Sequence, residues 1–159
     1  MRTLPVVCLL ISVIRLITGK LIISRKYLDT EIKTDEGKVF RIFRYISLKT
    51  SETNSRGSVF LVSFKFASLS FRVNKLTSII PMLIIAGTPG FTTKIYAVCP
   101  DDGYWLGMYQ WDSIENLNKY KTSFVFRMMK RRAIADSLST VEIADKSLIE
   151  FLDEHKIKN

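Results

Sequence analysis

The chain has 159 residues, of which 47% are hydrophobic and 25% are charged. This length and composition predict one domain with a buried core and exclude wholesale disorder. The formal net charge is +9, and the whole excess lies in residues 1–75, which hold 14 Lys and Arg against 5 Asp and Glu. Residues 76–159 hold 10 of each kind. Such an asymmetry predicts an anionic partner near the N-terminal half, either lipid headgroups or nucleic acid.

The chain contains two cysteines, Cys8 and Cys99, and one histidine, His155. Because the cysteines are far apart and form no C-x-x-C pair, we expect neither a disulfide framework nor a zinc site. A single histidine near the C-terminus leaves little material for histidine-ligated metal or haem. The sequence also lacks a P-loop, a dinucleotide fingerprint and a Ser/His/Asp set. We therefore predict no metal and no cofactor.

Residues 4–24 form the most apolar window of the chain. The longest uncharged run in this N-terminal segment, Thr3 to Ile14, spans twelve residues, which is shorter than the roughly 20 that cross a bilayer. At 100° per residue, Ser12, Arg15 and Thr18 fall on one arc and apolar residues fall opposite. This pattern predicts an amphipathic helix within residues 1–28 that associates with a membrane. A helix that packs on its own domain is the alternative.

We expect the main domain to lie on the cytoplasmic side of that membrane, because basic residues follow the apolar run. The pattern does not decide whether the helix lies on the bilayer or spans it. The residues expected to contact the membrane are Leu9, Leu10, Val13, Arg15, Leu16, Ile17, Lys20 and Leu21.

Residues 29–57 have the composition of a linker that contains one further structured segment. Residues 29–38 are polar, and residues 50–57 have a loop composition. Residues 39–49 fit a strand period, with Arg44 out of pattern, and they also fit a helix period. Their β-branched and aromatic residues favour a strand.

Residues 58–159 show an ordered alternation of strands and helices. The strands are predicted at 58–70, 92–99, 104–112 and 139–144, and the segment 100–103 has the composition of a tight hairpin turn. The helices are predicted at 72–87, which Pro81 should kink or split, and after residue 112, with a last helix near the C-terminus. Asp112 and Glu115 form the pattern of a capping box, and Asp145 is placed to cap the last helix.

The order β-α-β-β-α-β predicts an α+β fold of the ferredoxin-like type. Four strands would form one antiparallel sheet with both helices on one face. The other face carries apolar residues and must be covered, so we expect a homodimer that packs sheet against sheet.

Three stretches within residues 58–155 resemble a known family. These are "PGFTTKIY" (89–96), "GMYQWDS" (107–113) and the Leu117–Tyr120 spacing, which resemble the YdhR-type monooxygenase-like proteins, relatives of the antibiotic-biosynthesis-monooxygenase superfamily. The resemblance implies a dimeric α/β barrel with a pocket between sheet and helices. It also implies cofactor-independent oxygenation of activated aromatic or polyketide substrates.

The resemblance transfers no catalytic residue to this chain. Members that degrade haem use a histidine on the second helix, and this chain has none there, which argues against that branch. The remaining candidates for a pocket lie on the two central strands: Lys94, Tyr96, Trp105, Tyr109 and Trp111.

Each pocket candidate also has a purely structural interpretation. The aromatic rings are either walls of a ligand pocket or ordinary core between the sheet and the helices. Lys94 is either a buried base or anion partner, or a surface lysine. Gly107, between the rings, marks a bulge or a close approach by backbone or ligand.

The sequence therefore supports two functions of different classes. The first is a membrane-associated, monooxygenase-like protein that acts on a small hydrophobic or aromatic molecule. The second is a non-enzymatic dimeric binding module for a hydrophobic ligand. A nucleic-acid adaptor ranks last, because "RMMKRR" (127–132) also fits a helix C-terminus, where cations complement the helix dipole.

Overall fold

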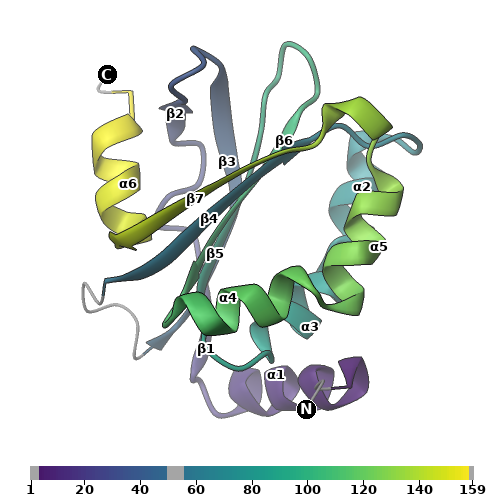
Figure 1. Cartoon of the computed structure of the whole chain (residues 1–159), viewed down its shortest axis with the longest axis vertical. Helices are drawn as coiled ribbons and strands as arrows, with labels where there is room; N and C mark the ends of the chain where they lie inside the picture. The colour runs from purple at the N-terminus through teal and green to yellow at the C-terminus, as the bar shows by residue number, and fades with distance from the viewer. Residues whose placement is uncertain (1–3, 50–55, 158–159) are drawn as a thin grey trace.

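A computed structural model describes residues 4–49 and 56–157, and within these residues seven strands form one antiparallel sheet with helices on both faces (Figure 1). The strands are β1 (Leu21–Ser24), β2 (Glu31–Lys33), β3 (Val39–Leu48), β4 (Gly57–Phe64), β5 (Phe91–Val98), β6 (Trp105–Trp111) and β7 (Ser139–Lys146). The helices are α1 (Pro5–Ile17), α2 (Phe71–Thr77), α3 (Ile79–Ala86), α4 (Ile114–Lys121), α5 (Phe124–Arg132) and α6 (Leu148–His155), with a short 3₁₀ turn at Ala135–Ser137.

The strand order along the sheet is β1-β3-β5-β6-β4-β7, and β2 also pairs with β3. The part from β4 onward therefore has the order β5-β6-β4-β7, in which each helical connection joins strands that are not neighbours. This is the ferredoxin-like arrangement that the order of elements predicts, so the α+β, ferredoxin-like fold class is confirmed. The N-terminal strands extend this sheet beyond β5.

The two faces of the sheet bury different side chains because successive residues of a strand point to opposite faces. Phe60, Trp105 and Trp111 pack under helices α2 to α5, whereas Leu61 and Met108 pack toward α6. Figure 1 shows α6 alone on its side of the sheet. The face expected to bind a second copy is thus buried within one chain, and the homodimer stays a prediction.

The segment between the first helix and residue 57 contributes more structure than its composition indicated. Residues 39–48 form strand β3, which confirms the strand interpretation, and residues 31–33 form β2 within the expected linker. Strand β1 pairs with the other end of β3. The expected boundaries at residues 28 and 57 therefore fall within one continuous sheet.

Both long helices predicted after residue 58 are divided in two. The first divides at Ser78 into α2 and α3, which places Pro81 in the first turn of α3, where a missing N–H costs no helical hydrogen bond. The second divides at Thr122 and Ser123, and the Ser123 hydroxyl accepts a hydrogen bond from the Phe126 N–H to start α5. The first break lies three residues before Pro81, where a kink or split was expected, and Ser78 makes no side-chain cap to α3. The Ser123 cap marks the second break, which the apolar periodicity did not reveal.

The expected helix caps are each displaced to a serine. Ser113, not Asp112, caps α4 by accepting from the Asn116 N–H at 3.3 Å. Ser147, not Asp145, caps α6 and forms a capping box with Glu150. Asp and Ser are both good caps, so the sequence placed the helix starts within about two residues but not the capping atom.

Helix α1 packs against α3 with its polar side facing inward. The Ser12 hydroxyl donates to the Leu83 carbonyl, and the Arg15 guanidinium donates to the Ala86 carbonyl. These carbonyls lie in the last turn of α3, which carries the negative end of the helix dipole. Arg15 is therefore a partner of the domain, not a membrane contact.

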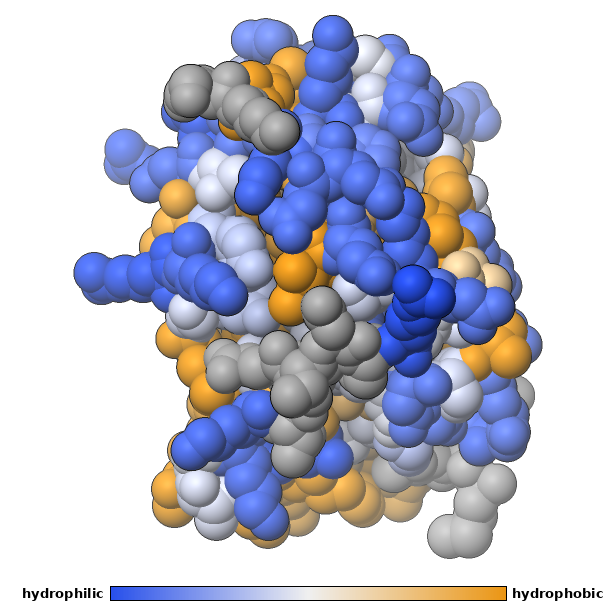
Figure 2. All heavy atoms as spheres, turned by 90° about the vertical axis from the view of Figure 1, so that its left-hand side faces the viewer, coloured by the Kyte–Doolittle hydropathy of each residue, from blue (hydrophilic) through white to orange (hydrophobic). Residues whose placement is uncertain are grey.

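The predicted membrane contacts are consequently divided between the inside and the outside of the domain. Leu21 is buried in the sheet and Leu16 packs against the core, which corrects their assignment. Of the predicted contacts, Leu10, Val13 and Ile17 are 59%, 39% and 81% exposed. Figure 2 shows orange spheres along the lower end of the molecule, the end at which α1 lies in Figure 1. In the described part of the chain, no helix has the length and apolarity needed to cross a bilayer.

The close crossing of α1 and α3 generates a stability prediction. Gly87 has an ordinary φ of −93°, but a Cβ there would lie 1.8 Å from the Cys8 carbonyl oxygen. We expect Gly87→Ala to lower the free energy of unfolding by about 1–3 kcal/mol through this clash, as measured by urea unfolding. Ile17→Ala, at the exposed end of α1, should change it by less than about 0.5 kcal/mol. Equal effects of the two variants would show that the crossing is not tight.

Candidate active site

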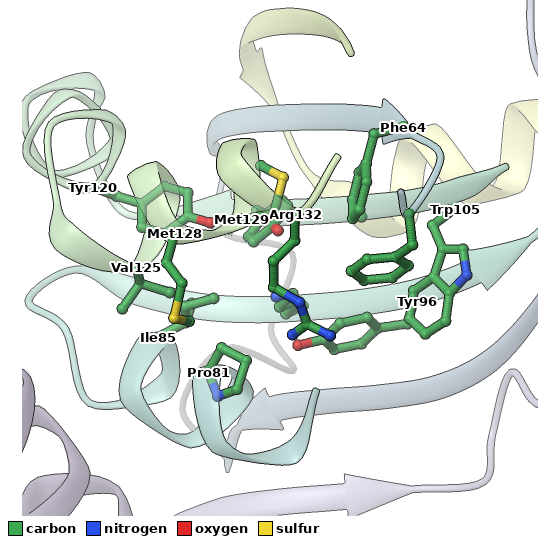
Figure 3. Close-up of a pocket in the computed structure, with 14 residues that line it drawn as sticks. Phe64, Pro81, Ile85, Tyr96, Trp105, Tyr120, Val125, Met128, Met129 and Arg132 are labelled. Atoms are coloured by element: carbon green, nitrogen blue, oxygen red, sulfur yellow. The ribbon is translucent and has the colours of Figure 1, made fainter. Parts of the chain in front are cut away.

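A cavity lies between the helix-facing side of the sheet and helices α3, α4 and α5 (Figure 3). Its volume is about 50 Å³, several times what one water needs. The walls are mostly apolar and aromatic, and none of the described residues contributes a carboxylate to the lining. Strands contribute Phe64, Lys94, Tyr96, Trp105, Gly107 and Tyr109, and helices contribute Pro81, Ile85, Tyr120, Val125, Met128, Met129 and Arg132.

Gly107 makes room in this cavity for the ring of Tyr109. A Cβ at Gly107 would lie 2.8 Å from Cε2 and 3.0 Å from the hydroxyl oxygen of Tyr109. The ring therefore lies across the glycine on the same strand face instead of standing upright. Tyr109 pairs across the sheet with Lys94, and Gly107 pairs with Tyr96, so the glycine opens space beside the lysine.

Lys94 is the central polar group of the cavity. Its side chain comes from the middle of β5, the residue is 3% exposed, and it lines the cavity wall. The Nζ atom lies 4.1 Å from the ring centroid of Tyr96 and 4.4 Å from that of Tyr109. Within the described residues no carboxylate pairs with it. Burial, and then the charge of Arg44, lower the pKa of Lys94 well below its usual value, so the amine is driven toward its neutral form.

Two anchored guanidinium groups add positive charge around the lysine. Arg44 donates to the Ser78 hydroxyl at 2.7 Å and to the Lys75 carbonyl at 2.8 Å, at the end of α2. Arg132 donates to the Asn74 side chain at 2.8 Å. In Figure 3 the Arg132 side chain reaches across the cavity toward Tyr96. An apolar cavity with cations and no carboxylate favours a ligand with an apolar body and an acidic group.

The tyrosine hydroxyls supply neutral hydrogen-bond donors. Burial raises the pKa of Tyr109 to about 12 and raises the pKa values of Tyr96 and Tyr120 well above their usual range. All three therefore stay protonated near neutral pH. The Tyr96 hydroxyl has no hydrogen-bond partner of good geometry in the part of the chain that the structure describes, so it can donate to a ligand.

The structure brings together four of the five predicted pocket residues. Lys94, Tyr96, Trp105 and Tyr109 all line the cavity. Trp111 lies deeper in the core, fully buried, and its ring stacks on Tyr120 at a centroid distance of 5.0 Å. Trp111 therefore supports the wall from behind without lining it.

Sequence reasoning missed the two arginines. Arg132 belongs to "RMMKRR", which fitted a helix end and does end α5, yet its side chain turns into the cavity. Arg44 disturbed the strand pattern of residues 39–48, and this irregularity was its signal. The sheet register shifts between Ile42 and Arg44, which places Arg44 on the helix-facing side beside Tyr96.

The fold and the cavity together define a ferredoxin-like α+β protein with a pocket between the sheet and its helices. Three solved structures of this class are similar, each with a TM-score of 0.54. A monooxygenase-like protein from Listeria innocua shares 17% identity, over 72% of this chain and 68% of its own. An uncharacterised ferredoxin-fold protein related to antibiotic biosynthesis monooxygenases, from Listeria monocytogenes, shares 13%, over 86% and 89%.

The third structure is a heme-degrading enzyme from Listeria monocytogenes, 11% identical, over 83% of this chain and 91% of its own. At these identities the similarity shows the fold alone. No family model and no curated protein matches the sequence. None of the three structures is described as YdhR-type, so that narrower resemblance stays a prediction.

The cavity residues do not fit a haem group. The single histidine, His155, lies in α6 on the opposite face of the sheet, where its ring stacks on Phe151 at 4.1 Å. The cavity lining contains no histidine, and a space of about 50 Å³ is far smaller than a porphyrin. Among the described residues, no cluster of three His, Cys, Asp or Glu side chains could hold a metal ion.

The buried amine generates a prediction on stability and pH. We expect Lys94→Met to raise the free energy of unfolding by about 1–3 kcal/mol at pH 7, because it removes a buried polar group without a partner. The unfolded chain keeps the Lys94 proton up to its usual pKa of 10.5, and the folded chain loses it at lower pH. Wild-type stability therefore gains from this group as pH rises toward that value, by up to about 1.4 kcal/mol per pH unit.

Urea unfolding at pH 7, 8 and 9 measures this effect. The advantage of Lys94→Met over the wild type should shrink as the pH rises. Lys33→Met, at an exposed position on β2, is the matched control and should follow the wild type. A constant advantage across this range would contradict a neutral buried amine.

Proposed function

We propose that the cavity binds a small hydrophobic or aromatic molecule with an acidic group and oxygenates it without a cofactor. The observation that carries this proposal is the buried Lys94 amine, which lies against two tyrosine rings in a cavity to which the described residues contribute no carboxylate. The similarity to monooxygenase-like structures supports the same reaction class at the level of the fold.

The first task of such a site is to remove a proton from the substrate. A neutral amine can accept that proton, and burial lowers the pKa of Lys94, which favours its neutral form before the substrate arrives. The resulting ammonium group then faces the substrate anion at short range in a medium of low polarity, where their attraction is strong. Lys94 thus serves first as the base and then as the counter-ion.

The second task is to stabilise the electron-rich anion while it reacts with dioxygen. The Tyr96 hydroxyl can donate to the developing oxyanion, and Arg132 adds a positive charge. When a ring methylene becomes a carbonyl, one atom of dioxygen enters the product, and the other leaves as water with the two methylene hydrogens. The substrate supplies all the electrons, so no external reductant is needed.

The cavity has room for only a few water molecules, so side chains in its wall must move before a larger substrate can bind. Met128 and Met129 lie on α5 and form part of this wall. Methionine side chains are unbranched and adapt their shape readily. We expect α5 to be the adjustable side of the pocket and the sheet to be the fixed side.

The second candidate is a dimeric binding module that holds such a ligand without reacting. One observation favours this second candidate. Among the described residues that line the cavity, Lys94 is the one base, because burial raises the pKa values of Tyr96 and Tyr109 and keeps both protonated. A site with a single base and no second acid–base group can bind an acidic ligand as a plain ion pair.

Oxygen consumption distinguishes the two functions. We expect purified protein to consume one O₂ per hydroxyaromatic or 1,3-dicarbonyl substrate in an oxygen electrode. Lys94→Met should slow this by about 100-fold or more, because it removes the base, and Lys33→Met should leave the rate unchanged. The wild-type rate should rise with pH through the Lys94 pKa and then level off. Ligand binding that needs Lys94 without any oxygen uptake would establish the binding module instead.

We also propose that α1 holds the domain against an anionic lipid surface. The supporting observation is the row of exposed apolar residues along its outer side, including Val6, Leu10, Ile14 and Ile17. The excess positive charge of residues 1–75 complements anionic headgroups. In this arrangement α1 lies flat on the surface and its polar side stays bound to α3.

Co-sedimentation with vesicles of phosphatidylcholine and phosphatidylglycerol tests the lipid contact. We expect Ile14→Glu combined with Ile17→Glu to reduce binding at least about ten-fold, because buried apolar area and surface charge both weaken. The control is Val141→Glu, at a half-exposed position on β7 and not on α1. This variant should bind like the wild type. Equal sedimentation of all three proteins would remove the lipid surface from the proposal.

A further inference from the structure

We propose that Lys94 is a covalent site for small aldehydes and ketones, which its amine captures as an imine inside the cavity. This inference rests on the proposed function for the cavity as the ligand site and names carbonyl compounds as the substrate class. It goes further because it makes Lys94 a nucleophile as well as a base.

The position of Lys94 meets the geometric needs of a nucleophilic amine. Its Nζ lies in the cavity wall with aromatic rings 4.1 and 4.4 Å away and without an acidic partner among the described residues. A surface lysine holds its proton and is surrounded by water, whereas a lysine that is desolvated beside another cation is activated as a nucleophile. Arg44 is that second cation.

The reaction is a condensation without oxidant or reductant. The Nζ lone pair forms a bond to the carbonyl carbon, and the carbonyl π electrons move to oxygen. The two amine hydrogens leave with that oxygen as water, and a carbon–nitrogen double bond remains. The Tyr96 hydroxyl has no partner of good hydrogen-bond geometry in the described chain, although the Arg44 guanidinium lies beside it. It lies in the same cavity, where it can protonate the departing oxygen and be reprotonated afterward.

The charge of the cavity narrows the class of carbonyl compound. Arg132 lines the same cavity and its guanidinium is held by Asn74 at 2.8 Å. A carboxylate next to the carbonyl group would pair with this guanidinium while the carbonyl reaches Lys94. We therefore expect small oxo acids to be captured better than neutral aldehydes of similar size.

Reductive trapping of the full chain tests the covalent site. The protein is incubated with glyoxylate and cyanoborohydride near neutral pH, and modified lysines are located by peptide mass mapping. We expect Lys94 to be modified on the order of ten times faster than any other lysine, because exposed lysines are almost fully protonated at this pH. Lys94→Met should lose the fast modification, and Lys33→Met should retain it.

Two further measurements test whether the reactivity of Lys94 depends on the folded cavity and not on the amine alone. Unfolding the protein in urea should abolish the advantage of Lys94 over other lysines. Propanal, which lacks the carboxylate, serves as the matched probe. Arg132→Gln should slow the capture of glyoxylate several-fold more than it slows the capture of propanal. Because both probes are tested on the same variant, a general loss of folding would slow both.

The outcome separates this inference from the proposed oxygenase. Modification spread over surface lysines, with the same rate in Lys94→Met, would overturn the covalent site. Lys94-dependent oxygen uptake without any trapping would also overturn it and leave Lys94 as a base alone. Fast trapping at Lys94 without oxygen uptake would support the carbonyl site and refute the oxygenase.

Discussion

The architecture around the cavity depends on one buried amine. Lys94 lies 3% exposed beside the rings of Tyr96 and Tyr109, and none of the described residues places a carboxylate against it. Burying an unpaired cation is costly, and the least costly response is loss of the proton. The surrounding residues intensify this effect, since Arg44 adds like charge and the aromatic walls exclude water. This group lies in the wall of the cavity between the sheet and the helices, where a ligand in that cavity would meet it.

The rest of the sheet maintains that environment. Gly107 lets the Tyr109 ring lie flat beside the lysine, and Trp111 supports Tyr120 from behind. The N-terminal strands extend the sheet so that β3 brings Arg44 next to Tyr96. Helix α1 packs against the C-terminal end of α3, where Ser12 and Arg15 donate hydrogen bonds to carbonyl groups in the last turn of α3. The added N-terminal segment therefore shapes the cavity as well as the outer surface.

Local sequence patterns predicted the strands of the ferredoxin-like core because strand periodicity and turn composition act over a few residues. They also located four cavity residues, since Lys94, Tyr96, Trp105 and Tyr109 alternate on two adjacent strands. They did not identify the capping residue where two good capping residues lie close together. Ser113 and Ser147 cap α4 and α6, where Asp112 and Asp145 were expected to do so. The same patterns left two partners open for the polar arc of α1, lipid headgroups or its own domain, and the structure shows that this arc pairs with α3.

The sequence by itself determined the fold class and the strand faces, because side-chain alternation along a strand is fixed by backbone geometry. It also showed that the chain has too few histidines and cysteines, one and two, to form the clusters on which metal or redox sites of that kind depend. Only the tertiary structure decided that Lys94 is buried, that Arg44 and Arg132 join it, and that Trp111 does not. Burial and charge proximity arise between residues far apart in the chain, such as Lys94 and Arg132, and no local pattern contains that information. The same reason explains why the inward side of α1 could not be chosen until its partner, the end of α3, was in place.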